Sequence, residues 1–143
     1  MIYWLRNIFA YLVCAIAAEA TARWLGSTVV ADTLIPNLTA TVIALLAINV
    51  QTTAVIAVKL RELADRAAST FGPTLKQFRL AIYEQAALVI ASFAISTIAK
   101  SPMATDSSLP LNVAALFVLF ASLHIFLDTS VGLLIALFPE HEE

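Results

Sequence analysis

Residues 38–66 read LTATVIALLAINVQTTAVIAVKLRELADR. The first part, 38–58, holds no charged residue, and at about 1.5 Å of rise per helical residue it is long enough to cross a hydrocarbon layer about 30 Å thick. The second part continues without Pro or Gly into a charged run that contains Lys59, Arg61, Glu62, Asp65 and Arg66. An uncharged segment of this length that ends in charges is typical of a membrane-spanning helix with one end in water.

The bulk composition supports the same interpretation. The chain has 143 residues, of which 61% are hydrophobic and 13% charged, and its mean hydropathy is +0.90. A water-soluble domain of this size could not cover so much apolar surface with so few charges. A net charge of −2 without a dense basic face predicts no nucleic-acid partner. Cys14 is the only cysteine, which excludes an intrachain disulfide.

The rest of the chain supplies three further apolar segments. We predict an all-α polytopic membrane protein, a single domain over 1–143 with four spans in one up-and-down bundle: about 2–25, 38–58 extending to 69, 80–99 and 111–138. The extension of the second span is expected to be a short, charged cytoplasmic helix. For the first span a cleaved signal peptide is the alternative, since Ala18-Glu19-Ala20 has the form of a cleavage site.

Turn residues predict where two of these helices end and begin. Gly26 is expected just past the first helix and Pro36 just before the second. The connector 26–37 between them is apolar and is expected to lie along the membrane surface or against the bundle. Asn37 is expected to cap the second helix.

The distribution of Lys and Arg predicts the orientation. The connector between the second and third spans is rich in them, whereas the other connectors hold only Arg23 and Lys100 near their edges. By the positive-inside rule this central connector is cytoplasmic, and both termini then lie on the same side. We therefore expect an integral membrane protein of a bacterial inner (plasma) membrane with cytoplasmic N- and C-termini.

Small residues predict where helices pack in lipid, because burying Leu against lipid tails yields little. In the second span such residues recur every three or four positions on one face, together with one amide. They are Ala40, Ala44, Ala47, Gln51 and Ala54. Similar stripes occur in the first and third spans, and we interpret all of them as seams between helices.

Polar side chains inside the spans are the candidate functional residues, since a charge near the bilayer centre costs at least about 2.5 to 3.5 kcal/mol. The candidates are Glu19, Asn49, Gln51, His124 and Asp128. His124 and Asp128 are four residues apart on one helix face and could hydrogen-bond each other. Counting residues from the cytoplasmic ends predicts two polar layers, one joining Asn49 to Asp128 and the other Glu19 to His124.

Two interpretations of these layers stay open. In the first, Glu19 pairs with Arg23 and the other polar groups are satisfied interhelical hydrogen bonds that fix the packing. In the second, some of them line a hydrated path for protons or cations, inside one copy or around the axis of an oligomer. Glu84, one turn inside the predicted third span, is expected to be able to reach the cytoplasmic interface.

Three functions follow as expectations. The preferred one is a homo-oligomer, in contact with the lipid bilayer, that forms an ion- or proton-conducting pore. The alternative is a membrane anchor or subunit that docks a soluble cytoplasmic protein through the 59–79 connector, with candidate contacts Arg61, Glu62, Asp65, Arg66, Lys76 and Arg79. A further alternative is a small proton-coupled transporter built on Glu19 and His124.

No enzyme motif, metal-ligand cluster or cofactor motif occurs in the sequence, so we expect no catalysis, no metal and no cofactor. The run Ala15-Ile16-Ala17-Ala18-Glu19-Ala20 resembles the glutamate-bearing helix of small multidrug resistance transporters, which also have four spans. Those proteins are shorter, rich in Gly and without a long charged connector. The resemblance is therefore not extended to function.

Overall fold

The computed structural model describes residues 2–67, 72–101 and 108–137. These residues form four long helices and one short π-helical segment: α1 (Ile2–Trp24), η1 (Val30–Leu34), α2 (Ile35–Ala67), α3 (Gly72–Ala99) and α4 (Ser108–Leu137). No strand occurs among the described residues, which confirms the all-helical prediction. Four segments are long and apolar enough to span a membrane: Leu5–Trp24 in α1, Val30–Glu62 in η1 and α2, Thr74–Ala99 in α3 and Leu109–Gly132 in α4.

The end of α1 agrees with the prediction. Gly26 has a φ of +65°, a left-handed conformation that costs glycine nothing. The Ser27 amide donates to the Ala22 carbonyl (2.8 Å) and the Gly26 amide to the Arg23 carbonyl (3.0 Å). These two hydrogen bonds satisfy carbonyls at the end of the helix and form a Schellman turn.

The other helix starts differ from the prediction. The connector 26–37 is largely helical, because η1 runs directly into α2 at Ile35. Pro36 is the second residue of α2, and Asn37 does not cap the helix, because its Nδ2 donates to the Thr33 carbonyl (2.8 Å). α3 begins at Gly72 instead of residue 80, with Pro73 in its first turn, where a missing amide hydrogen is tolerated.

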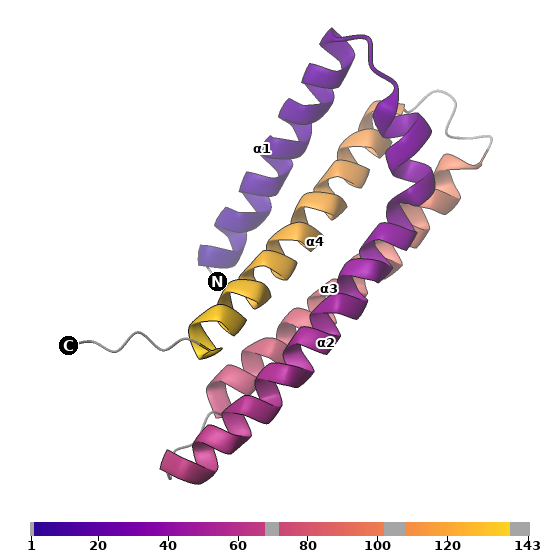
Figure 1. The fold of residues 1–143 in the computed structure, drawn as a ribbon. Coiled ribbons are helices and arrows are strands. Elements are labelled where there is room, and N and C mark those ends of the chain that lie inside the picture. Colours follow the sequence, from indigo (N-terminus) through magenta and orange to yellow (C-terminus); the bar gives the residue numbers. More distant parts are fainter. Residues whose placement is uncertain (1, 68–71, 102–107, 138–143) are drawn as a thin grey trace.

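The four helices alternate in direction, and α4 contacts each of the others (Figure 1). α2 and α3 pack against each other and against α4, whereas α1 lies on the other side of α4. The starts of α1 and α3 and the ends of α2 and α4 lie at one end of the molecule (Figure 1). We call it the basic end, because Lys59, Arg61, Lys76 and Arg79 are located there on α2 and α3.

The apolar core lies toward the opposite end. One cluster joins α2 to α4 and another joins α1, η1 and α4; the members are Ile35, Leu38, Val42, Ala115 and Val118 in the first, and Ala15, Val30 and Leu116 in the second. Large apolar side chains such as Phe9, Ile90 and Phe93 are exposed. An apolar outer surface of this kind suits lipid.

Candidate functional site

Glu19 is buried between α1 and α4 and has two partners. Its side chain is 2% exposed, and its Oε1 accepts hydrogen bonds from Arg23 Nε (2.8 Å) and from Asn112 Nδ2 (2.9 Å). The pair with Arg23 is confirmed, but the partner on α4 is Asn112 and not His124. Counting residues from the cytoplasmic helix ends gave the wrong partner, because α1 is displaced along α4, away from the basic end (Figure 1). Glu19 is therefore engaged in joining α1 to α4.

Asn49 is fully buried between α2 and α3. Its Nδ2 donates to Gln85 Oε1 (2.6 Å), and both side chains are 0% exposed. The predicted neighbour was Asp128 on α4, so both the partner and the helix differ from the expectation. An amide in the middle of the third apolar segment is the sequence signal that could have identified Gln85.

Gln51 is exposed, together with the whole stripe of small residues on α2. Ala40, Ala44, Ala47 and Ala54 are exposed as well, so within one copy the stripe is not a seam, contrary to the prediction. The buried positions of α2 lie on a different face and are Ile35, Leu38, Val42, Asn49, Ile56 and Leu60. This face packs against α3 and α4 because its larger side chains fill the space between the helices, where small residues would leave voids.

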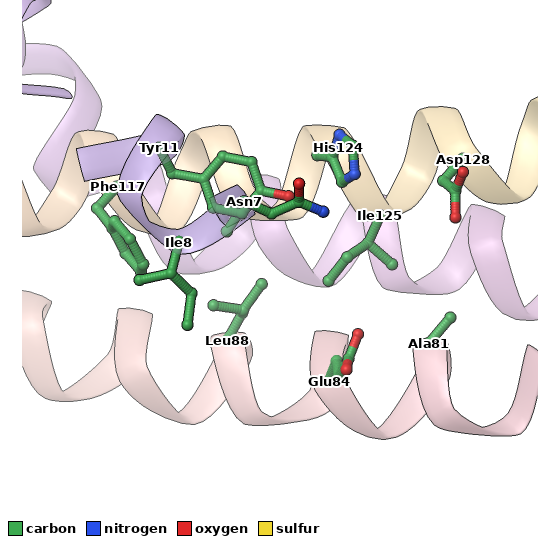
Figure 2. A pocket seen from close by; sticks show the side chains of 11 residues that line it. Asn7, Ile8, Tyr11, Ala81, Glu84, Leu88, Phe117, His124, Ile125 and Asp128 are labelled. Atoms are coloured by element: carbon green, nitrogen blue, oxygen red, sulfur yellow. The ribbon is translucent and has the colours of Figure 1, made fainter. Parts of the chain in front are cut away.

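His124 and Asp128 lie at a cavity of about 310 Å³ between α1, α3 and α4. Figure 2 shows the side chains that line it, with Glu84 on α3 directed toward α4 and Asp128 on α4 directed toward α3. Asn7 and Tyr11 of α1 add two further polar groups. The remaining lining residues are Ile8, Ala81, Leu88, Phe117, Ala121 and Ile125. Among the described residues, no Lys or Arg lines this cavity.

The cavity concentrates negative charge. Within the described part of the chain neither Glu84 nor Asp128 makes a hydrogen bond or an ion pair, and both carboxylates act electrostatically on the Tyr11 hydroxyl. The His124 ring lies against the Tyr11 ring, with centroids 5.4 Å apart and planes at 50°. The expected hydrogen bond between His124 and Asp128 is not formed. Two carboxylates beside an imidazole and a phenol can attract and hold a cation or exchange protons.

This geometry does not resemble a metal chelate. Among the described residues, no group of three or more His, Cys, Asp or Glu side chains is close enough to hold a metal ion. A cation at this cavity would keep part of its hydration shell or be a proton.

The candidate docking residues lie at the basic end. Arg61 and Glu62 are exposed near the end of α2, and Glu62 accepts a hydrogen bond from Lys59 (2.9 Å). Lys76 and Arg79 are exposed in the first turns of α3. The side chains of Asp65 and Arg66 lie outside the described residues, although both residues belong to α2.

Comparisons with protein families, with curated proteins and with solved structures find no match to this chain.

Proposed function

We propose that this chain is an integral membrane protein whose four helices form an up-and-down bundle with the basic end in the cytoplasm. The apolar outer surface and the four segments of spanning length support insertion. Lys59, Arg61, Lys76 and Arg79 at one end support the orientation by the positive-inside rule. Both termini are then cytoplasmic, and the membrane is a bacterial inner (plasma) membrane.

Within this arrangement the protein conducts cations or protons through the site formed by Glu84, His124 and Asp128. The observation that carries the proposal is that neither carboxylate has a partner among the described residues, although both lie within apolar segments of spanning length. Unpaired ionisable groups inside a membrane are costly and mark ion or proton pathways. Glu19 and Asn49, which have partners, hold the helices together instead.

Copies of the chain associate through the exposed stripe on α2. Gln51 supports this part of the proposal, because its amide is exposed within the spanning segment Val30–Glu62 and would otherwise face lipid. Small neighbours such as Ala47 and Ala54 let a second helix approach closely. A homo-oligomer built in this way leaves the cavity of each copy free.

Flux measured in reconstituted vesicles tests the proposal. Asp128→Asn and Glu84→Gln each remove a carboxylate with little change of shape, and each is expected to lower proton or K⁺ flux about tenfold. Asp32→Asn is the matched control, because Asp32 is exposed outside the cavity, and it leaves flux unchanged. Unchanged flux in both cavity variants and in His124→Ala, with unchanged oligomer size, would reject conduction.

Docking of a soluble cytoplasmic protein is the second candidate function. Its support is the exposure of Arg61, Glu62, Lys76 and Arg79, which present a mixed-charge surface at the basic end. Replacing Arg61, Glu62, Lys76 and Arg79 by Gln separates the two functions, because it removes the charged surface and keeps the turns of α2 and α3 that carry it. Loss of the cellular function with intact assembly and intact flux favours docking.

Proton-coupled transport is a variant of the first function. It was expected to rest on Glu19 and His124, but Glu19 is held by Asn112 and Arg23 away from the cavity. A transporter would therefore use Glu84 and Asp128 with His124. Binding of a substrate that depends on these two carboxylates, with no flux in its absence, would distinguish transport from a pore.

A further inference from the structure

A second cavity of about 430 Å³ lies at the basic end between α2, α3 and α4. Its walls include Leu60 near the end of α2, Thr74 and Gln77 in the first turns of α3, and Asp128 and Thr129 on α4. The end of α2 and the start of α3 lie at this end of the molecule (Figure 1), and Leu60, Thr74 and Gln77 belong to the last turns of α2 and the first turns of α3. This cavity therefore begins where the proposed orientation places water.

The two cavities follow one another along the same pair of helix faces. On α3 five of the six lining residues are spaced three and four apart and thus share one face: Thr74, Gln77, Ala81, Glu84 and Leu88. On α4 the corresponding residues are Gly132, Asp128, Ile125 and Ala121. Ala81 and Asp128 line both cavities, and Figure 2 shows them facing each other across the gap between α3 and α4.

Small side chains occur on both sides of this junction. Ala81 presents only a methyl group opposite Asp128. At Gly132 a Cβ would come within 3.7 Å of the Phe78 ring, so any larger side chain would have to occupy the space beside that ring. Bulk at either position would therefore narrow the connection between the two cavities.

Toward the opposite end, the described residues of α1, α2 and α4 pack closely. Leu38, Val42 and Ala115 are 0% exposed in the cluster between α2 and α4, and Ala15 is 0% exposed in the cluster between α1 and α4. The hydrogen bond that Asn112 Nδ2 donates to Glu19 Oε1 joins α4 to α1 at the same end. Close-packed interiors of this kind exclude water.

We infer that water and small hydrated cations reach Asp128 from the basic end, through the second cavity, and that Ala81 and Gly132 keep this passage open. The inference rests on the proposed insertion in a membrane, but it does not require that anything is conducted to the other side. Asp128, which is exposed, is then the point at which the passage meets the first cavity with Glu84, His124 and Tyr11.

Chemical labelling of a single cysteine tests the passage. In a Cys14→Ser background, Asp128→Cys is treated with a membrane-impermeant methanethiosulfonate that carries a quaternary ammonium group, applied to one side of oriented membrane vesicles. Lys59→Cys and Asp32→Cys identify the basic and opposite sides, since both residues are exposed. Ser122→Cys, at a fully buried position of α4, gives the rate for a site without access.

Asp128→Cys is expected to react from the basic side only, and more slowly by about tenfold when Ala81→Leu or Gly132→Leu is added. Two blocking variants are used because either one alone could disturb packing. Reaction only from the opposite side, or at the rate of Ser122→Cys, would overturn the inference. So would a rate that neither blocking variant changes, because the reagent would then enter between α1 and α3. Labelling from the basic side without any flux keeps the passage and rejects conduction.

Discussion

Two regions of this molecule differ in whether their polar side chains have hydrogen-bond partners. Between α1 and α4, and between α2 and α3, the buried groups Glu19 and Asn49 have partners at 2.6–2.9 Å. In the cavity, Glu84 and Asp128 have no such partner among the described residues. The Asn49–Gln85 pair makes one hydrogen bond and leaves Asn49 Oδ1 and Gln85 Nε2 without a partner among the described residues. In a membrane a polar group bonded to another helix joins the two helices, whereas a charge without a partner is a cost that only a ligand or an ion offsets. The contrast separates groups that hold the fold from groups available for function.

Removing Glu19 gives the largest expected loss of stability. Glu19→Ala leaves Asn112 buried without its hydrogen bond to Glu19 and removes the ion pair between Glu19 and Arg23, and it should lower the free energy of unfolding by about 2 kcal/mol. Glu19→Gln keeps an acceptor for Asn112 and should lose less than half of that. The measurement is reversible unfolding in mixed detergent micelles.

The same unfolding measurement on a variant of the cavity is expected to show no loss of stability. Glu84→Gln should leave the free energy of unfolding unchanged or raise it, because Glu84 makes no hydrogen bond or ion pair with the part of the chain that the structure describes. If Glu84→Gln destabilises the protein as much as Glu19→Ala, the distinction between the two regions fails.

Asn49→Ala should have a smaller effect, a loss of about 1 kcal/mol in the free energy of unfolding, since interhelical hydrogen bonds in membrane proteins are modest. The loss arises because Gln85 stays fully buried with its Oε1 no longer bonded. Gln51→Ala truncates an exposed amide on the same helix and should leave the unfolding of a single copy unchanged. Equal losses in the two variants would show that burial of the amide is not what stabilises α2 against α3.

The helices could be predicted because lipid imposes a simple rule on the chain. A segment such as 38–58 must be uncharged and long enough to cross the membrane, and Gly26 ends α1 for a local steric reason. Partners across helices could not be predicted in the same way. The pairs Glu19–Asn112 and Asn49–Gln85 depend on which helices are neighbours and on how far each is shifted along its axis, and neither is a property of one segment.

The predicted start of the third span explains why Glu84 was not among the candidate site residues. With the third helix taken to start at residue 80, Glu84 falls in its first turn, where a carboxylate can reach the membrane surface. α3 starts at Gly72, and at about 1.5 Å per residue Glu84 then lies about 18 Å along the helix. Lys76 and Arg79, which suggested an aqueous connector, are the first turns of this helix and mark the basic end.

The smallest predicted effect comes from comparing two buried serines, one with a hydrogen bond and one without. Ser92 and Ser122 are both 0% exposed, one on α3 and one on α4, but Ser92 Oγ donates to the Val89 carbonyl (2.7 Å) whereas Ser122 Oγ has no partner among the described residues. Ser92→Ala should cost about 0.5 kcal/mol of unfolding free energy, and Ser122→Ala should cost nothing or stabilise slightly, because a buried hydroxyl without a hydrogen bond opposes folding. Both substitutions remove one oxygen atom from a closed interior, so the volume change is the same. A larger loss for Ser122→Ala than for Ser92→Ala would mean that the Ser122 hydroxyl is satisfied in the membrane, for instance by a water molecule from the passage that leads to Asp128.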